Sequence, residues 1–318
     1  MHGVILDRET FDLGDVDCAA LVQALETWDS YAATSAGMVN RRIKNAEVVV
    51  SSKVRIGDGG IKAAPGLALI VVAGTGTDNI DLDAASRRGV TVCNARNYAT
   101  PAVVQHTVGL MLALATNLAA YHAAVRAGRW ARARQFCFLD YPVRELHGRA
   151  LGIVGYGALG RGVARAGRAL GMEILLCNRP RAVRRKGRLD FAELLARADV
   201  LSLHCPLSEQ TRGLIGAAEL AAMKPDALLV NTARGGIVDE TALADALRRG
   251  VIGGAAVDCL SAEPPKDGNP LLAGDIPNLL LTPHSAWGSL GARQRLADQV
   301  ADIITAYRAN TPRNVVAP

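Results

Sequence analysis

The sequence has few aromatic residues and no long apolar run. Phe, Trp and Tyr make up 4% of the 318 residues, so Ala, Leu, Val and Gly must do most of the packing. No apolar stretch reaches the roughly 20 residues that a membrane-spanning helix needs. The first residues also lack the basic head and apolar core of a signal peptide. We therefore expect a cytoplasmic globular protein without a membrane partner, long enough for two domains.

The cysteines form no pattern typical of a disulfide framework. The six thiols are widely spaced without a CxxC pair, and several lie in strand-like apolar runs. This distribution is typical of buried free thiols in a reducing compartment. The spacing of His, Cys, Asp and Glu predicts no metal site either.

Excess positive charge is confined to one short segment. The net charge is +6, and residues 179–188 hold six cations and no acid, so the rest of the chain is neutral. A nucleic-acid-binding protein would spread Lys and Arg over a face and interleave aromatic residues. A single local patch indicates a single local anion instead, and we expect no nucleic-acid partner.

Short apolar segments alternate with helical segments, which is typical of parallel α/β architecture. The predicted strands are Gly3–Leu6, Glu47–Ser51, Ala68–Val72, Val90–Cys93, Leu151–Val154, Met172–Cys177, Val200–His204, Ala227–Asn231, Gly254–Asp258 and Asn278–Thr282. The predicted helices include Cys18–Thr27, Leu82–Arg88, Thr100–Val125 and about Leu290–Ala309. We expect two doubly wound parallel-sheet domains, with junctions near Tyr98–Pro101 and Trp287.

The helix predicted from Thr100 and the segment after it indicate a subunit contact. Thr100 is expected to cap this helix, and Pro101 suits its first turn. Residues 108–115 are apolar on all sides, so this part must be buried in a core or against another subunit. Residues 128–146 have few periodic cues and are expected to form an extended arm. Since one domain would struggle to bury both, we predict a homodimer.

A glycine-rich turn joins a predicted strand to a helix in the second half of the chain. Its glycines have the G-x-G-x-x-G spacing, which permits a tight turn, close approach of the backbone to a pyrophosphate, and close packing of the helix on the strand. The helix N-terminus then offers free N–H groups and a positive dipole end to the phosphates. We therefore expect a dinucleotide to contact Gly155, Tyr156, Gly157, Ala158, Leu159 and Gly160.

The next strand ends in Asn178-Arg179, where an NAD site would have an acidic residue. That carboxylate accepts a hydrogen bond from the ribose 2′-OH and would repel a 2′-phosphate. Asn178 removes the repulsion, and Arg179 can pair with the phosphate. Further positive potential is expected from Arg181, Arg184 and Arg185. We predict that Asn178, Arg179 and Pro180 contact NADP as the preferred cofactor, with NAD as the alternative. The competing interpretation is a solvated basic loop, with Asn178 bonded to a ribose.

Three ionisable side chains follow the carboxyl ends of predicted strands. Arg234 lies in LLVNTARGG, Glu263 in AAVDCLSAEPP and His284 in NLLLTPHSAW. Ligands of open parallel sheets bind at these strand ends, so we expect the three segments to face one crevice.

These residue types fit the reduction of a 2-oxo acid. Hydride adds to the carbonyl carbon while the carbonyl oxygen takes up a proton, which an imidazolium can donate. A carboxylate bonded to the other ring nitrogen favours the protonated ring and fixes its orientation. An arginine can hold the substrate carboxylate and polarise the carbonyl group.

Four segments closely resemble the D-isomer-specific 2-hydroxyacid dehydrogenase family: VGYGALGRGVA, LHCPLSEQTRGLIG, MKPDALLVNTARGGIVDETAL and LTPHSAW. The resemblance extends over nearly the whole chain and includes VVAGTGTDNIDLDAASRRGVTVCNA. Within the family, NYATPAVVQHT, QFCFLDYPVREL and TPRNVV are most similar to bacterial hydroxypyruvate reductases, also called glycerate dehydrogenases. The implied domains are a substrate-binding domain, residues 1–99 and 288–318, and an inserted dinucleotide-binding domain, residues 100–287.

The resemblance also implies roles for individual residues. Arg234 would anchor the substrate, and His284 would be the acid/base with Glu263 as its carboxylate partner. Asp258 would hold the nicotinamide carboxamide, with Thr107 near that ring. Further cofactor contacts are implied at His204, Cys205, Pro206, Thr211, Thr232, Ala233 and His284. Substrate contacts are implied at Lys53, Val54, Ala73, Gly74, Thr75, Gly76 and Arg234.

Together these features predict reduction of a small 2-oxo acid, hydroxypyruvate or glyoxylate, to the D-2-hydroxy acid. One alternative is formate or phosphite oxidation on the same fold, but relatives that oxidise formate carry Gln where this chain has Glu263. A second alternative is a nucleotide-sensing corepressor or scaffold without activity. The complete set of Arg, Glu and His favours the enzyme.

Overall fold

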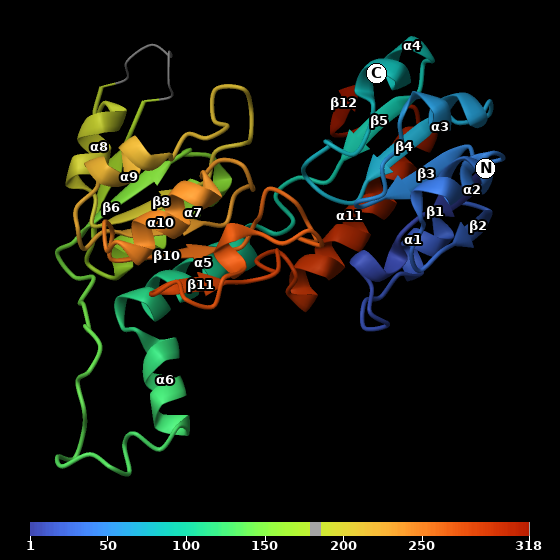
Figure 1. Cartoon of the computed structure of the whole chain (residues 1–318). Coiled ribbons are helices and arrows are strands. Elements are labelled where there is room, and N and C mark those ends of the chain that lie inside the picture. Colours follow the sequence, from blue (N-terminus) through green and yellow to red (C-terminus); the bar gives the residue numbers. More distant parts are fainter. Residues whose placement is uncertain (179–185, 318) are drawn as a thin grey trace. The chain divides into compact units, whose positions relative to one another are not determined.

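The computed structural model describes residues 1–178 and 186–317, which divide into two compact units (Figure 1). Unit 1 comprises residues 1–100 with 287–318, and unit 2 comprises residues 101–286. The chain therefore completes unit 2 before it returns to unit 1. The predicted cofactor residues Arg179 and Pro180, and the cations Arg181, Arg184 and Arg185, lie outside the described residues.

Unit 1 is built on a six-stranded sheet with the order β12-β5-β4-β3-β1-β2. Its elements are β1 (His2–Ile5), α1 (Ala19–Gln23), β2 (Thr27–Ser30), α2 (Val39–Ile43), β3 (Val48–Ser51), α3 (Asp58–Ala63), β4 (Leu69–Val72), α4 (Leu82–Arg87), β5 (Thr91–Asn94), α11 (Leu290–Arg308) and β12 (Val315–Ala317). All neighbouring strands are parallel except β12 and β5. Every residue of β3 and β4 is buried, as expected for central strands with both faces covered.

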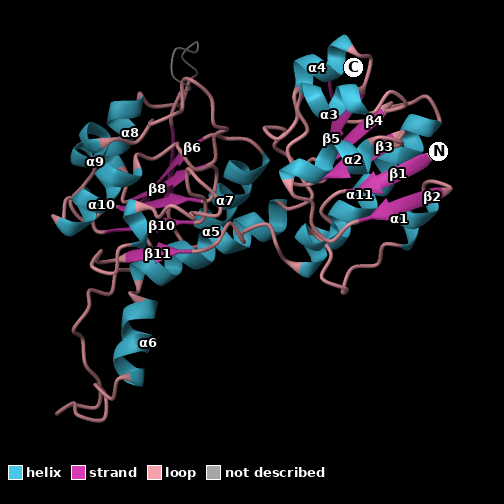
Figure 2. Cartoon of the chain, turned by 45° about the vertical axis from the view of Figure 1, so that its right-hand side comes forward, coloured by secondary structure: helices cyan, strands magenta, loops and turns pink. Residues whose placement is uncertain are grey.

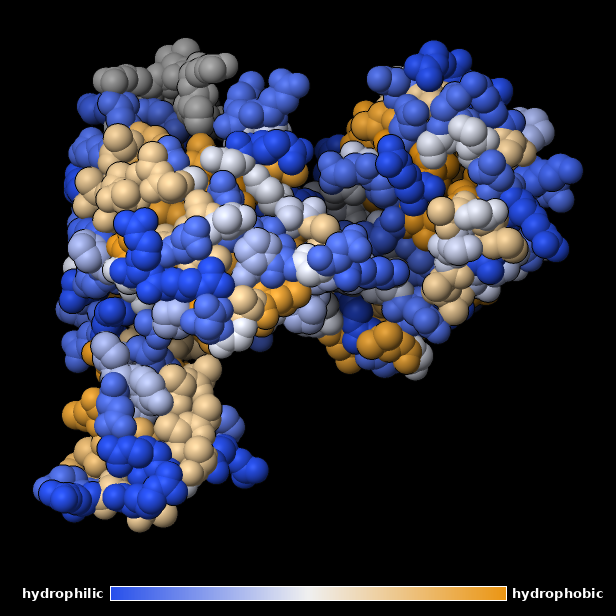
Figure 3. All heavy atoms as spheres, in the orientation of Figure 1, coloured by the Kyte–Doolittle hydropathy of each residue, from blue (hydrophilic) through white to orange (hydrophobic). Residues whose placement is uncertain are grey.

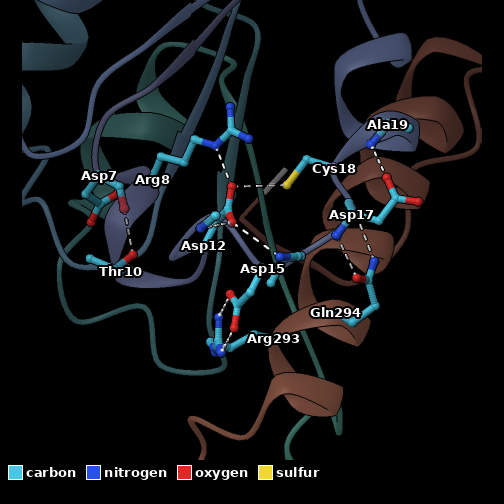
Figure 4. Close-up of polar contacts among 12 residues, drawn as sticks. Asp7, Arg8, Thr10, Asp12, Asp15, Asp17, Cys18, Ala19, Arg293 and Gln294 are labelled. Carbon is cyan, nitrogen blue, oxygen red and sulfur yellow. Dashed lines mark hydrogen bonds and ion pairs between the residues drawn. The ribbon is translucent and has the colours of Figure 1, made fainter.

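The segment before α1 is tied to α11 by an ion pair and by hydrogen bonds (Figure 4). The guanidinium of Arg293, a residue only 8% exposed, donates to Asp15 at 2.5 and 2.7 Å. Asp12 accepts from Arg8 at 2.8 Å. Burial alone would raise the pKa of Asp12, but hydrogen bonds from Arg8 and from the Gly14 N–H outweigh burial and hold that pKa below its ordinary value.

Unit 2 contains a second six-stranded sheet, with the order β11-β10-β9-β8-β6-β7 and all strands parallel. Its elements are α5 (Thr100–Ala115, whose first residue belongs to unit 1), α6 (Leu118–Arg126), β6 (Ala150–Val154), α7 (Ala158–Ala169), β7 (Glu173–Leu176), α8 (Phe191–Arg197), β8 (Val200–Leu203), α9 (Ala217–Ala222), β9 (Leu228–Asn231), α10 (Glu240–Arg248), β10 (Gly254–Val257) and β11 (Leu279–Leu281). Figure 2 shows the strands of both sheets together with the helices that accompany them. The prediction of two doubly wound parallel sheets is confirmed.

The helix predicted over Thr100–Val125 is wrong in two respects. It is interrupted after Ala115, because Asn117 adopts a left-handed conformation (φ 51°) before α6 begins. Thr100 is the first residue of α5 rather than its cap. Within this chain the Leu112 side chain is 39% exposed, so burial of the apolar part of α5 against another subunit stays a prediction.

Helix α6 and the segment after it project from the rest of unit 2 (Figures 1 and 2). The predicted arm is confirmed in that residues 127–149 contain no helix or strand. Arg129 pairs with Asp140 at 2.8 Å, and the Tyr121 hydroxyl donates to the carbonyl of Tyr141. Among the described residues, no single helix is long and apolar enough to cross a membrane, and α5 and α6 pass that criterion only as a pair bent by 63°.

Candidate active site

The glycine turn between β6 and α7 has the geometry of a phosphate cradle. Gly155 has φ 95°, and a Cβ there would lie 2.5 Å from the carbonyl carbon of His204. A Cβ at Gly160 would lie 2.1 Å from the Gly155 oxygen, so helix and strand meet more closely than any side chain permits. A Cβ at Gly157, which precedes α7, would have no described heavy atom within 4 Å. The open face at the helix N-terminus fits an anionic pyrophosphate.

His204, after β8, supplies a second indication that a ligand binds beside this turn. Its Nε2 lies 2.8 Å from the Ser202 hydroxyl, while its Nδ1 is buried without a hydrogen-bond partner among the described residues. Burial lowers the pKa of His204 to about 4, so the ring is neutral at pH 7. A buried ring nitrogen without a partner is costly, and a bound cofactor offers groups that could pair with it.

The neighbouring residues 205–211 form a turn with internal support. The Thr211 hydroxyl donates to the carbonyl of Pro206 at 2.6 Å and accepts from the Ser208 N–H at 2.8 Å. Burial raises the pKa of Cys205 to about 11, so its thiol is protonated and unreactive at pH 7. The turn is therefore held by its own hydrogen bonds, and its Cys205 thiol adds no charge to this edge of the sheet.

The end of the basic run lies beside the glycine turn. Asn178 is half-buried, and its N–H donates to the Leu189 carbonyl at 3.0 Å. Arg188 donates to the Cys177 carbonyl at 3.2 Å, and its guanidinium lies 5.9 Å from the ring centre of Tyr156. Sequence reasoning counted Arg188 among the cations but did not single it out. Its position beside Tyr156 follows from no local sequence pattern.

Thr107 links α5 to the segment after β9. Its buried hydroxyl lies 2.8 Å from the hydroxyl of Thr232 and donates to the Val103 carbonyl. In the same segment the N–H of Ala233 donates to the side chain of Asn231 at 3.1 Å. The structure thus brings together Thr107, Thr232 and Ala233, which were assigned to the cofactor separately.

Arg234, Glu263 and His284 follow β9, β10 and β11, three adjacent parallel strands. The Nδ1 of His284 lies 2.6 Å from Glu263 Oε2, and the other carboxylate oxygen accepts from the Leu260 N–H at 2.9 Å. The His284 and Glu263 side chains are 23% and 34% exposed, so the pair is anchored yet accessible. Arg234 is half-buried and donates to the carbonyl of Ala233 at 2.8 Å. The arrangement holds one ring nitrogen against a carboxylate and leaves the other for proton transfer.

Asp258 supports the segment that carries His284. Its carboxylate is 1% exposed and accepts from the Thr282 hydroxyl at 2.5 Å and from the N–H groups of Ser285 and Ala286 at 2.9 and 3.1 Å. His106 Nε2 lies 3.1 Å from the same hydroxyl and 3.6 Å from the carboxylate. The role implied for Asp258 at the nicotinamide carboxamide stays a prediction. Sequence reasoning missed this loop-supporting role.

Two further residues missed by sequence reasoning support the Glu263 loop. Glu240 accepts from the N–H and hydroxyl of Ser261, at 2.6 and 2.7 Å, and from the Asn269 amide at 2.6 Å. A Cβ at Gly235 would lie 1.9 Å from the Leu260 carbonyl oxygen, so only glycine permits this contact. In the sequence, the Gly-Gly pair directly after Arg234 could have indicated that another segment packs closely there.

In unit 1, the predicted substrate segments follow β3 and β4, two adjacent parallel strands. The buried carboxylate of Asp7, a residue labelled in Figure 4, accepts from the N–H groups of Ser52, Lys53 and Val54 at 2.9, 2.7 and 3.3 Å. These N–H groups therefore already have an anionic partner. Sequence reasoning missed Asp7, which lies more than forty positions upstream of the segment it holds.

Ala73, Gly74, Thr75 and Gly76 form the turn after β4. The Thr75 hydroxyl donates to the Ala95 carbonyl at 3.0 Å, and the Asn94 amide donates to the Thr75 carbonyl at 2.6 Å. The turn is thus fixed from the neighbouring strand. Its assignment to the substrate stays a prediction.

A glycine turn at a helix N-terminus and a histidine–carboxylate pair at the carboxyl edge of one parallel sheet define a nicotinamide-dependent oxidoreductase. Residues 108–286 match the model of the D-isomer specific 2-hydroxyacid dehydrogenase NAD-binding domain. The chain belongs to the D-isomer-specific 2-hydroxyacid dehydrogenase family.

Relatives with assigned names support this placement. The chain is 47% identical to a glycerate dehydrogenase of Methylorubrum extorquens over 86% of this chain and 87% of the relative. It is 32% identical to a hydroxypyruvate reductase of Blautia hydrogenotrophica over 99% of both chains. Among solved structures, the NADPH-dependent glyoxylate/hydroxypyruvate reductase of Sinorhizobium meliloti, in complex with NADP and malonate, has a TM-score of 0.83 and 26% identity. That alignment covers 99% of this chain and 96% of the other.

Proposed function

We propose that this enzyme reduces hydroxypyruvate to D-glycerate and glyoxylate to glycolate, with NADPH as the preferred reductant. The observation that carries the proposal is the 2.6 Å contact between His284 and Glu263 at the same sheet edge as Arg234. The names of the glycerate dehydrogenase and hydroxypyruvate reductase relatives support the substrate class.

In the proposed mechanism, a bound nicotinamide supplies the hydride to the carbonyl carbon. His284, protonated on both nitrogens, donates the Nε2 proton to the carbonyl oxygen as negative charge develops there. Glu263 accepts a hydrogen bond from Nδ1 and keeps the ring oriented while the positive charge is lost. Arg234 binds the substrate carboxylate and stabilises the carbonyl oxygen in the transition state.

We assign cofactor binding to unit 2 and substrate binding to the segments after β3 and β4 of unit 1. The N–H groups of Lys53 and Val54 already donate to Asp7. We therefore assign the carboxylate contact in unit 1 to the Lys53 side chain and to the backbone of residues 73–76. We also propose that the enzyme is cytoplasmic and has no nucleic-acid or membrane partner.

A substrate panel tests the proposed function. The purified enzyme is assayed with NADPH and NADH against hydroxypyruvate, glyoxylate, pyruvate and 3-phosphohydroxypyruvate, and in the oxidative direction with formate and phosphite. The highest kcat/KM is expected with hydroxypyruvate or glyoxylate. Turnover with formate or phosphite alone would overturn the proposal, and binding of a nucleotide without any turnover would favour a sensing role.

NADPH is expected to exceed NADH mainly through a lower KM. The 2′-phosphate is distant from the reacting carbon, so its binding energy is nearly the same in ground and transition states. A charge-assisted contact of about 1.5–3 kcal/mol corresponds to roughly 10- to 150-fold in affinity. Arg188, whose guanidinium lies near the Tyr156 ring, would add a further positive charge to the contacts proposed for Asn178 and Arg179. The preference should decrease as salt rises.

The matched variants are Asn178→Asp with Arg179→Leu, which should erase or reverse the preference, and Arg168→Leu as a cation control on α7. The measurement is kcat/KM for both cofactors at low and moderate salt. Equal values for the wild type, or better values with NADH, would show that the basic run is a solvated loop.

We also propose a homodimer that covers α6 and the arm. Phe136 and Leu139 are 88% and 78% exposed in the single chain, and Trp130 is 55% exposed. Figure 3 shows hydrophobic as well as hydrophilic surface on this projecting part of unit 2. Exposed apolar side chains of this size within ten positions of one another are typical of an interaction surface. In a symmetric dimer, each of these side chains would be buried in both subunits.

Sedimentation is expected to show twice the chain mass of 33.4 kDa at micromolar concentration. Phe136→Asp with Leu139→Asp should shift the enzyme toward monomer, because the interface would have to bury four carboxylates. Leu13→Asp is the control, since Leu13 is 72% exposed but lies in unit 1. A wild-type monomer at micromolar concentration would contradict the proposal.

A further inference from the structure

A thiol lies beside the His284–Glu263 pair. One donor atom each from Cys259, Glu263 and His284 lies within 4.8 Å of the others. Cys259 directly follows Asp258 at the end of β10 and is 2% exposed, whereas the other two side chains are partly open to solvent. The set therefore combines a sulfur at the base of the site with a nitrogen and an oxygen at its accessible side.

We propose that this triad is an inhibitory binding site for thiophilic divalent cations, with Zn²⁺ as the representative ion. Thiolate, imidazole and carboxylate are the three ligand types that zinc takes in proteins, and three protein ligands with one open position is a common zinc arrangement. Hard cations such as Mg²⁺ prefer oxygen ligands and would not use the sulfur. Inhibition rests on the proposed function, because it acts by occupying His284.

The proton balance explains the inhibition. On binding, the Cys259 thiol releases a proton to solvent, a doubly protonated His284 releases its Nδ1 proton and keeps its Nε2 proton, and Glu263 binds as carboxylate. Two anionic ligands then neutralise the ion, and water fills the fourth position. Because Nδ1 now carries the metal, the ring cannot become the doubly protonated acid that the reduction requires. Glu263 is withdrawn from its hydrogen bond at the same time.

The geometry requires only a modest adjustment. Ligand distances of about 2.0–2.3 Å in a tetrahedral zinc site place neighbouring donors about 3.5 Å apart. His284 Nδ1 and Glu263 Oε2, now 2.6 Å apart, would have to separate by roughly 1 Å, and the Cys259 sulfur, which lies within 4.8 Å of the other two donor atoms, would have to approach by at most about 1.3 Å. Rotation of the partly exposed Glu263 and His284 side chains can supply this, since Cys259 is buried just after β10 and has less freedom to move.

The test compares Zn²⁺ inhibition of wild type, Cys259→Ser and Cys137→Ser, each with saturating NADPH and hydroxypyruvate. Cys137 is the matched control, because it is a partly exposed thiol outside the site. Wild type and Cys137→Ser should be inhibited at micromolar Zn²⁺ and recover with EDTA, whereas Mg²⁺ has no effect. Cys259→Ser should keep kcat within about twofold and raise the inhibition constant at least about tenfold, the loss seen even for outer-shell partners of a metal.

Co²⁺ gives a readout that does not depend on turnover. Titration of the wild type should produce a thiolate-to-cobalt charge-transfer band that is retained in Cys137→Ser and absent in Cys259→Ser or, if that variant folds poorly, in Cys259→Ala. Equal zinc inhibition of wild type and Cys259→Ser, or no charge-transfer band in the wild type, would overturn the site. A band in an enzyme that reduces no 2-oxo acid would leave the metal site standing and reject the proposed function.

Discussion

Replacing His284 by alanine is expected to lower kcat for hydroxypyruvate reduction by roughly 100-fold or more, the scale of losing a general acid. The reason is that no proton can reach the developing alkoxide from the position that the imidazole occupies. Cofactor affinity should change little, because the glycine turn and the residues after β8 remain. The measurement is steady-state kcat, together with NADPH affinity from fluorescence quenching.

His122→Ala is the control for this variant, since His122 is an exposed histidine on α6 in the same unit. It should retain wild-type turnover. A His284→Ala enzyme with near-normal kcat would remove His284 from the acid/base role. The 2.6 Å contact with Glu263 would then be a structural ion pair.

Arg234→Ala is expected to lower kcat/KM by roughly 1,000-fold. The guanidinium is proposed both to bind the substrate carboxylate and to stabilise the carbonyl oxygen, and loss of one such oxyanion donor alone costs about 100- to 1,000-fold in kcat. Both KM and kcat should therefore change. Arg234→Lys should recover only part of the loss, because an ammonium lacks the planar fork that binds a carboxylate through two hydrogen bonds.

Arg249→Ala serves as the control, because Arg249 is an exposed arginine just after α10. The assay varies the concentration of hydroxypyruvate at saturating NADPH for each variant. If Arg234→Ala raised KM alone and left kcat intact, the arginine would be a ground-state anchor only. If neither changed, Arg234 would not contact the substrate.

The strands of unit 2 and the central strands of unit 1 could be predicted from the sequence, whereas β2 and β12, the edge strands of unit 1, could not. β3 and β4 are apolar throughout because both faces of the sheet are covered. β2 is largely exposed and has no apolar run, and the apolar run of β12 has only three residues, which is too short to predict a strand. The predicted helix from Cys18 was extended through Thr27 for the same reason, since nothing local marked the start of β2.

Strand ends located the ionisable residues of the site, because the carboxyl ends of parallel strands meet at one edge. The groups that hold those residues in place could not be predicted. Asp7 supports the segment after β3, and Glu240 supports the loop that bears Glu263. Such contacts join positions that are distant in the sequence, and the sequence does not indicate which of its acidic residues makes them. Cys259 illustrates the same limit. It is distant from His284 in the sequence, and the two residues become neighbours only when the strands assemble into a sheet.

The most direct measurement follows the product formed by the purified enzyme from hydroxypyruvate and NADPH. One equivalent of D-glycerate should form for each NADPH oxidised, as determined by chiral chromatography against absorbance loss. The same reaction with Glu263→Gln should be slower and keep the D configuration, because Glu263 orients the acid and does not choose the face of the carbonyl. L-glycerate as the product, or NADPH oxidation without glycerate, would contradict the proposed reaction.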